Sequence, residues 1–179
     1  MPLFICTACG TQYPESGQVP PHCVICDEER QYVPSRGQTW TTLEALQQTH
    51  SNTFREYEKG IIGIGSTPAF AIGQRTLLVR TDAGNILWDC IATLDDATVT
   101  MIQGLGGIDA IAISHPHFYT TMVEWANAFT ARIHLHAADK LRIPMIADSR
   151  SRRRFHGVMP LRLRQGPIAW RPIFACCLR

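Results

Sequence analysis

The sequence has 179 residues, of which 45% are hydrophobic and 18% charged, and its formal net charge is +2. This length and composition indicate a globular protein with one packed domain and a small appendage. The N-terminal residues lack the basic start and apolar core of a signal peptide, and no run approaches the ~18 apolar residues of a membrane span. We therefore predict a cytoplasmic protein without a membrane segment.

The charges are divided unevenly along the chain. Residues 1–140 carry eight Lys and Arg against fourteen Asp and Glu, a net charge of −6, whereas residues 141–179 carry nine Arg against one acid, a net charge of +8. We expect three parts: a four-cysteine module at 1–35, an α/β body at 38–140 and an Arg-rich tail at 141–179 without regular periodicity.

Four of the seven cysteines form two Cys-x-x-Cys pairs, Cys6 with Cys9 and Cys23 with Cys26, separated by thirteen residues. Two residues between paired thiolates let a tight turn place both sulfurs on one cation, and two such turns complete the tetrahedron that zinc accepts. Such pairs are typical of metal sites in a reducing compartment, so we predict a structural zinc site. Iron suits the same cage. The alternative to a metal site is a set of free or redox-active cysteines.

The body begins with a predicted helix over residues 41–60. Thr41 and Glu44 have the spacing of a capping box, and Gly60 suits a helix end. The pattern places a break in this helix near Ser51.

Strand and helix signals follow in turn. Short apolar or alternating runs, broken by Gly, Pro and a turn at 82–85, predict strands at 61–65, 69–73, 75–81 and 85–90. The later elements are a helix at 95–107, a buried strand at 108–114, a helix at 122–131 and a strand at 132–136. Thr121 and Glu124 form a second capping box. Strands first in hairpins and then alternating with helices indicate an α/β (α+β) fold with a mixed sheet.

Two histidines follow the buried strand. His115 and His117 lie one residue apart where the backbone leaves the sheet, so both imidazoles can turn toward one point. Neutral imidazoles are the usual ligands of catalytic zinc or iron, which makes this pair the candidate for an active-site metal. The alternative is a pair of loop histidines bonded to backbone or solvent. Cys90, in contrast, is expected to be a small buried apolar residue.

Residues 60–140 resemble the first half of a metallo-β-lactamase-fold hydrolase. The match rests on "LLVRTDAGNILWDC", a helix, "GGIDAIAISHPHFYTT", a further helix and "ARIHLHAADK". In this superfamily an Asp-ending strand like "ILWD" precedes a strand that carries a His-x-His-x-Asp-His metal motif. His115 and His117 match its first two histidines, whereas Tyr119 and Thr120 stand where the Asp and the third histidine would be.

The resemblance implies an incomplete metallo-β-lactamase-like αβ half-sandwich, in a branch of the superfamily with an N-terminal zinc module. It also implies metal-dependent hydrolysis of an unidentified small molecule, with zinc or iron at His115 and His117 and metal-bound water as the nucleophile. One metal is expected there, with Tyr119 in the position of a second. Asp89 would lie beneath the metal loop and support it. From the sequence alone, Asp89 is equally a turn residue at a strand end.

The second half of the superfamily fold, which would bring further metal ligands, has no counterpart after Lys140, where the remaining histidine is His156. A shifted reading frame or a retained non-coding segment would produce such a tail, and a genuine basic tail is the competing interpretation. Our hypothesis is a truncated metallohydrolase with weak or no activity. The rival is a zinc-stabilised binding module whose tail contacts an acidic protein or nucleic acid. The sequence leaves the oligomeric state open.

Overall fold

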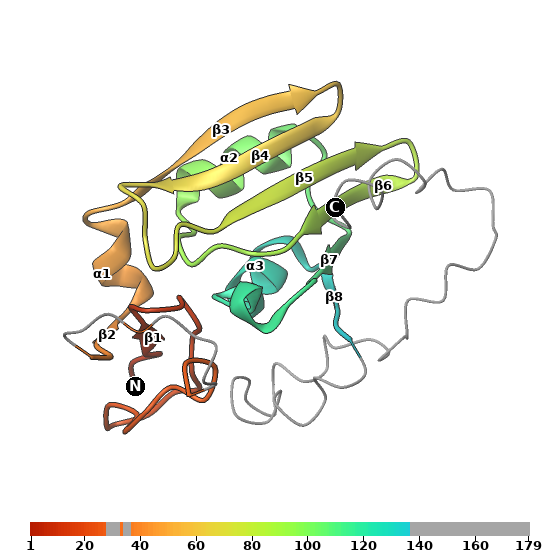
Figure 1. Cartoon of the computed structure of the whole chain (residues 1–179). Helices are drawn as coiled ribbons and strands as arrows, with labels where there is room; N and C mark the ends of the chain where they lie inside the picture. The colour runs from red at the N-terminus through yellow and green to blue at the C-terminus, as the bar shows by residue number, and fades with distance from the viewer. Residues whose placement is uncertain (28–32, 34–36, 137–179) are drawn as a thin grey trace.

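The computed structural model describes residues 1–27, 33 and 37–136, whose arrangement is shown in Figure 1. A small sheet pairs β1 (Ile5–Cys6) with β2 (Trp40–Thr41), and a six-stranded sheet has the order β3-β4-β5-β6-β7-β8. The strands of the larger sheet are β3 (Ser51–Glu58), β4 (Ile61–Thr67), β5 (Arg75–Thr81), β6 (Gly84–Trp88), β7 (Ala110–Ala112) and β8 (Arg132–His134). The helices are α1 (Leu43–Gln47), α2 (Asp96–Gly104), α3 (Met122–Phe129) and the 3-10 turn η1 (Pro116–Phe118).

The large sheet changes from antiparallel to parallel pairing at β6. Strands β3 to β6 form antiparallel pairs, and β6, β7 and β8 pair in parallel. Parallel neighbours need a crossover, which α2 and α3 provide. Two successive crossovers of the usual right hand place both helices on one face of the sheet, and α2 contacts α3. The predicted mixed α+β class is confirmed in this general form.

One face of the large sheet is deeply buried. A row of side chains, each at most 1% exposed, crosses β5 to β8 on this face: Leu78, Leu87, Ile111 and Ile133. The adjacent row on the opposite face is half-buried or exposed: Leu77, Trp88, Ala112 and His134. The main core therefore lies between the sheet and the helices, and the four cysteines belong to the same cluster of buried residues.

The helix predicted over 41–60 is wrong beyond its first turns, because α1 ends at Gln47. Its N-cap is Thr42, whose side chain accepts a hydrogen bond from the Ala45 N–H, and Thr41 belongs to β2 instead. The predicted capping box is therefore not formed by Thr41.

Residues 51–58 form a strand where we predicted the second part of that helix. Asn52 and Phe54 are half-buried while their neighbours are exposed, the alternation of a strand with one covered face. β3 pairs with β4 along its length, and Gly60 adopts a positive φ of 83° in the turn between them. The helix signals were local, and pairing with β4 overrides them.

The strand predicted at 69–73 is also wrong. Residues 71–73 form a turn between β4 and β5. Ala71 and Gly73 have φ values of 52° and 72°, which an extended strand does not contain.

The capping box predicted at Thr121 and Glu124 is not made. Thr121 lies at the start of α3, but its hydroxyl donates to the backbone oxygens of Ile91 and Ala92, both at 3.0 Å. Trp125 of α3 donates its indole N–H to the same Ile91 oxygen, also at 3.0 Å. The start of α3 is therefore fixed to the loop that follows β6.

The remaining predicted elements lie where the sequence placed them: β5 has the predicted bounds, β4 extends two residues further, and the others are shorter. Asp95 caps α2 by accepting a hydrogen bond from the Thr98 N–H. In the ranges 1–27 and 37–136, no helix has the length and apolar character that crossing a bilayer requires. The end of the predicted body at 137–140 and the predicted tail at 141–179 lie outside the described residues.

The two faces of β5 predict different responses to truncation. Leu78→Ala should lower the free energy of unfolding by about 3 kcal/mol, because it opens a cavity in the core, as such buried truncations typically do. The same change at the half-buried neighbour, Leu77→Ala, should cost less than about half of that. Urea unfolding of both variants measures the difference. Equal losses would contradict the placement of the core on one face.

Candidate metal centre

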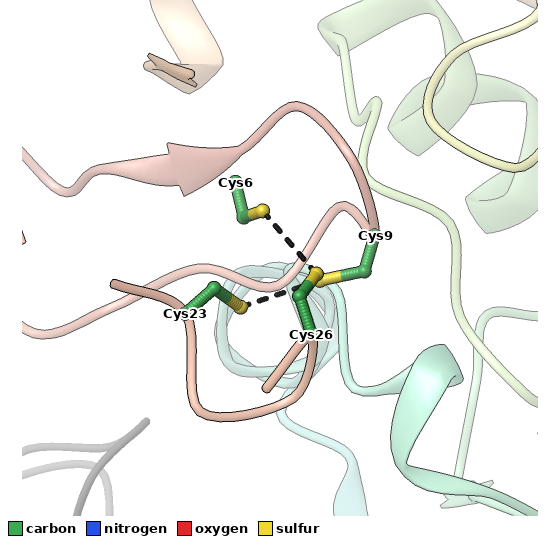
Figure 2. Close-up of side chains that lie close together, drawn as sticks. All are labelled: Cys6, Cys9, Cys23 and Cys26. Atoms are coloured by element: carbon green, nitrogen blue, oxygen red, sulfur yellow. Dashed lines mark hydrogen bonds between the residues drawn. The ribbon is translucent and has the colours of Figure 1, made fainter. Parts of the chain in front are cut away.

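The four cysteines form a compact cluster of sulfur atoms, as Figure 2 shows. All four sulfurs lie within 4.8 Å of one another, with 3.8 Å between Cys6 and Cys26 and 3.6 Å between Cys9 and Cys23. Zinc with tetrahedral bonds of about 2.3 Å to sulfur holds its ligands about 3.8 Å apart. The distances therefore fit a zinc ion, and the prediction that these cysteines form one group is confirmed.

Tight turns aim each pair of sulfurs at the same point. The Gly10 N–H donates to the Cys6 oxygen at 2.7 Å, and Gly10 has a φ of 82°, a conformation that favours glycine. In the second pair, the Cys26 N–H donates to the Cys23 oxygen at 2.9 Å. Each Cys-x-x-Cys segment is thus closed by its own backbone.

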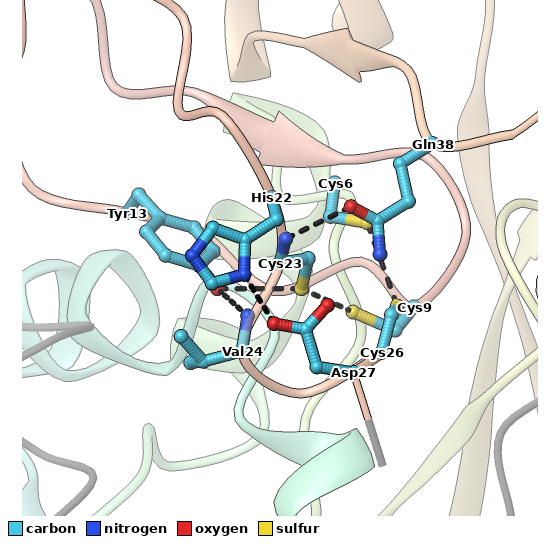
Figure 3. Close-up of polar contacts among 9 residues, drawn as sticks. All are labelled: Cys6, Cys9, Tyr13, His22, Cys23, Val24, Cys26, Asp27 and Gln38. Atoms are coloured by element: carbon cyan, nitrogen blue, oxygen red, sulfur yellow. Dashed lines mark hydrogen bonds and ion pairs between the residues drawn. The ribbon is translucent and has the colours of Figure 1, made fainter. Parts of the chain in front are cut away.

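Polar and aromatic neighbours fix Cys23 in the cluster (Figure 3). The Tyr13 hydroxyl donates to the Cys23 sulfur at 3.3 Å and accepts from the Val24 N–H at 2.8 Å. Gln38 accepts from the Cys23 N–H at 2.9 Å, and Tyr13 packs edge-on against Trp40 at 5.1 Å. These contacts orient the sulfur before any ion binds.

Four cysteine sulfurs complete the tetrahedral coordination of zinc, so the nearby His22 is not needed as a ligand. His22, the neighbour of Cys23, is exposed and contacts the carboxylate of Asp27 through its Nδ1 atom.

The charges of the thiols are strongly linked. The pKa of Cys23 is lowered, chiefly by the hydrogen bond from the Cys26 thiol and then by those from Cys6 and Cys9, while burial opposes the shift. The pKa values of Cys9 and Cys26 are raised, chiefly by their hydrogen bonds to Cys23. The pKa of Cys6 is lowered as well: its hydrogen bond with Cys23 opposes the shift, and those with Cys26 and Cys9 lower the pKa. The thiols therefore do not ionise independently, and all four are thiolates together only when a cation compensates the charge.

The histidine pair lies just beyond β7. His115 is exposed and His117 half-buried, and their rings stack with centroids 4.7 Å apart and an angle of 17° between the planes. The two Nδ1 atoms are 2.9 Å apart, and the His117 N–H also donates to the His115 Nδ1 at 3.3 Å. Two ring nitrogens at this spacing need a proton or a cation between them, because their lone pairs otherwise repel.

Two donors do not make a complete metal site. Within the part of the chain that the structure describes, the cysteines are the only group of three or more metal-ligating side chains. The structure thus brings His115 and His117 together and supplies no third ligand for them among those residues.

Asp89 ties the end of β6 to the histidine loop. Its carboxylate accepts from the Ser114 N–H at 2.8 Å and from the Ser114 hydroxyl at 2.9 Å. Asp89 is buried and has a φ of 65°, and its own N–H donates to the Ala112 oxygen at 2.7 Å. Burial raises the pKa of the Asp89 carboxyl, while the bonds from Ser114 and the charge of His115 oppose the rise. Asp89 is therefore both a turn residue and a support of the loop.

Tyr119 and Cys90 are buried core residues. Tyr119 is fully buried within the main apolar cluster. Its expected position at a second metal stays a prediction. Cys90 is also fully buried, and burial raises the pKa of its thiol. That setting agrees with the expectation of a small apolar residue.

Gln74 is a site residue that sequence reasoning missed. Its side-chain amide donates to the Cys9 oxygen at 2.6 Å and to the His117 oxygen at 3.0 Å. Gln74 stands between a turn and β5, where no local pattern marks it. Its two partners lie far away along the chain, so only the folded structure reveals the contact.

A hollow of about 240 Å³ extends from Gln74 across β3, β4 and β5. Arg55, Tyr57 and Arg75 form one side: Arg75 donates to the Tyr57 hydroxyl at 2.6 Å, and the Arg55 guanidinium lies 5.3 Å from the Tyr57 ring centre. The Tyr57 ring lies so close to Gly63 that an added Cβ would be 2.2 Å from it. None of the described residues that line this hollow is acidic.

Comparisons with known proteins assign no activity. No protein-family model matches the chain. Over 142 residues the chain is 46% identical to the uncharacterized protein YmaE of Bacillus subtilis (strain 168), which corresponds to 78% of this chain and 52% of YmaE. The chain therefore spans about half the length of this relative.

Loss of one cysteine ligand should abolish the zinc site. We expect Cys23→Ser to lose one metal ion per chain, together with the intense thiolate-to-metal absorption that Co²⁺ gives at a tetrathiolate site. Cys90→Ala is the matched control, since it removes a buried cysteine outside the group, and it should keep both. Metal analysis and Co²⁺ titration decide. Unchanged Co²⁺ absorption in Cys23→Ser would contradict the four-cysteine site.

Proposed function

We propose that the chain forms part of a zinc-dependent hydrolase of the metallo-β-lactamase type. In this proposal the four cysteines hold a structural zinc ion, and His115 and His117 bind the active-site metal, zinc or iron. The observation that carries it is the proximity of the two imidazoles, whose Nδ1 atoms lie 2.9 Å apart directly after β7.

The support of the histidine loop favours the same function. Ligand histidines in metal sites are held by carboxylates and backbone groups that fix their position. Asp89 makes two hydrogen bonds to Ser114, the residue before His115. A buried carboxylate placed in this way holds the start of the loop against the end of β6.

The ligand count sets what this chain contributes. Catalytic zinc usually has three protein ligands and an open position for water. His115 and His117 are two such donors, so a third donor has to come from outside the described residues. When bound there, the metal would supply a Lewis acid and an activated water for hydrolysis. The chain's own part is to bind through the two imidazoles and to hold their loop with Asp89.

The hollow beside Gln74 suggests an anionic substrate. Arg55 and Arg75 bring two guanidinium groups to its lining, and Arg75 keeps further N–H donors beyond the one it gives to Tyr57. Guanidinium groups recognise carboxylates and phosphates through charge-assisted hydrogen bonds. Gln74 lines the hollow and also donates to the His117 backbone oxygen, so this one residue contacts both the hollow and the histidine loop.

The second candidate function is a zinc-stabilised binding module for an acidic partner. The cysteines provide a complete set of four metal donors, whereas the histidines provide only two, and this contrast favours the binding module. Nine arginines in residues 141–179 would supply the binding charge. The two functions differ in the number of metal ions the chain binds.

Metal stoichiometry separates these functions. For the hydrolase we expect the full chain to bind two Co²⁺ ions, one at the cysteines and a weaker one at the histidines. His115→Ala and His117→Ala should each reduce this number to one, whereas the control His50→Ala, at the junction of α1 and β3, should leave it at two. Dialysis followed by metal analysis gives the count. A single ion in the unaltered chain would favour the binding module and refute the hydrolase.

The anionic substrate has its own test. Inorganic phosphate should bind the full chain, and Arg55→Ala and Arg75→Ala should each weaken that binding about tenfold, because each removes a charge-assisted hydrogen bond. Arg80→Ala is the control, since it removes one exposed arginine from the other end of β5. Titration calorimetry at constant ionic strength measures the affinities. An equal loss in Arg80→Ala would mean attraction by net charge, without a built site.

A further inference from the structure

We infer that the four-cysteine site sets the geometry of the histidine loop, residues 114–121, and that Gln74 is the positioning residue that connects the two. The link to a catalytic metal rests on the proposed function. The physical connection between the cysteine module and the loop is independent of the proposed function.

Gln74 makes the central contact. A side-chain amide has two N–H donors, and those of Gln74 lie within reach of two backbone oxygens, Cys9 at 2.6 Å and His117 at 3.0 Å. The side chain is 9% exposed, so water competes little for these bonds. One amide therefore holds a cysteine of the metal cluster and a histidine of the candidate site at a fixed separation.

A second contact joins the module to the end of the loop. The Gln12 N–H donates to the Thr120 oxygen at 3.0 Å. Gly10, in the turn after Cys9, is packed so closely that an added Cβ would lie 3.3 Å from the Thr120 methyl and 3.4 Å from the Ala92 Cβ. The cysteine turn thus rests directly on the loop, at a residue whose φ of 34° is unusual for threonine.

The loop is consequently held at three places. Asp89 fixes its start through Ser114, Gln74 fixes its middle through His117, and Gln12 fixes its end through Thr120. Two of these three attachments depend on the cysteine turn. Metal binding by a small cysteine module is coupled to its folding, so the metal at the cysteines also orders the histidine loop.

Gln74→Glu tests this connection with a nearly isosteric change. It replaces the donating nitrogen with an oxygen that faces two backbone oxygens. In the zinc-loaded full chain we expect amide hydrogen exchange in residues 114–121 to become about tenfold faster, as expected from the loss of roughly one hydrogen bond, while exchange in β5 and β6 stays the same. Gln103→Glu is the matched control, because it makes the same substitution on an exposed position of α2. Unchanged exchange in the loop of a folded Gln74→Glu chain would overturn the inference.

Metal removal gives a second, independent measurement, which begins with the unaltered chain. Chelation of the zinc from the unaltered chain should accelerate amide exchange in residues 114–121 more than in β5 and β6. In Gln74→Glu, where the connection is already broken, chelation should accelerate exchange in residues 114–121 by a smaller factor. Gln74→Met, which is neutral and also lacks the donor, replaces Gln74→Glu in this comparison if the charged variant does not unfold cooperatively. Uniform acceleration throughout the sheet would mean that the zinc only stabilises the fold as a whole.

The metal affinity of the histidines separates this inference from the proposed function. If they bind Co²⁺, Gln74→Glu should weaken that binding about tenfold or more, as losses of supporting contacts do, while one Co²⁺ remains at the cysteines. If the unaltered chain binds one ion only, the hydrolase proposal fails, and the exchange measurements still decide the connection. Full histidine affinity in Gln74→Glu, with two ions bound, would show that Gln74 does not position them.

Discussion

Charge compensation among four buried sulfur atoms is the constraint on which the rest of the structure depends. The sulfurs lie within 4.8 Å of one another, and at this spacing they can all be thiolates only around a cation. Backbone hydrogen bonds from Gly10 to the Cys6 oxygen and from Cys6 to the Thr11 oxygen close the turn after Cys9, and bonds to a cation would restrain it further. That turn carries the contacts to Gln74 and Thr120. A metal bound at the cysteines would therefore act on the end of the large sheet as well as on its own module.

The pairing pattern of the sheet explains why the functional groups meet at one edge. Because β5 runs antiparallel to β6, the start of β5 lies beside the end of β6, and the parallel pairing of β7 brings its end to the same place. Gln74 precedes β5, Asp89 follows β6, and His115 comes shortly after β7. Three side chains from distant parts of the sequence are thereby gathered by backbone geometry alone, before any contact between them is considered.

What the sequence predicted correctly was encoded locally. The cysteine spacing fixes which sulfurs can share an ion, and the position of His115 and His117 after an apolar run places them beyond a strand. The strand β3 was mistaken for a helix because the pairing with β4 that creates it is not visible in residues 51–58 themselves. Gln74 was missed for a related reason, since its partners are 65 and 43 residues away. Local spacing thus revealed which cysteines and histidines lie together, and the contacts that orient them required the tertiary structure.

A two-histidine site benefits from being held rigidly. Each ligand that must be ordered when a metal binds reduces the net affinity, so a loop already fixed in place loses less conformational entropy. Attachments at Ser114, His117 and Thr120 restrain the loop from both sides of the histidines. A third donor from outside the described residues would meet an imidazole pair whose position is already set. Under the proposed function, a metal at the cysteines would contribute to catalysis without touching the substrate, by lowering the cost in conformational entropy of ordering the two histidines.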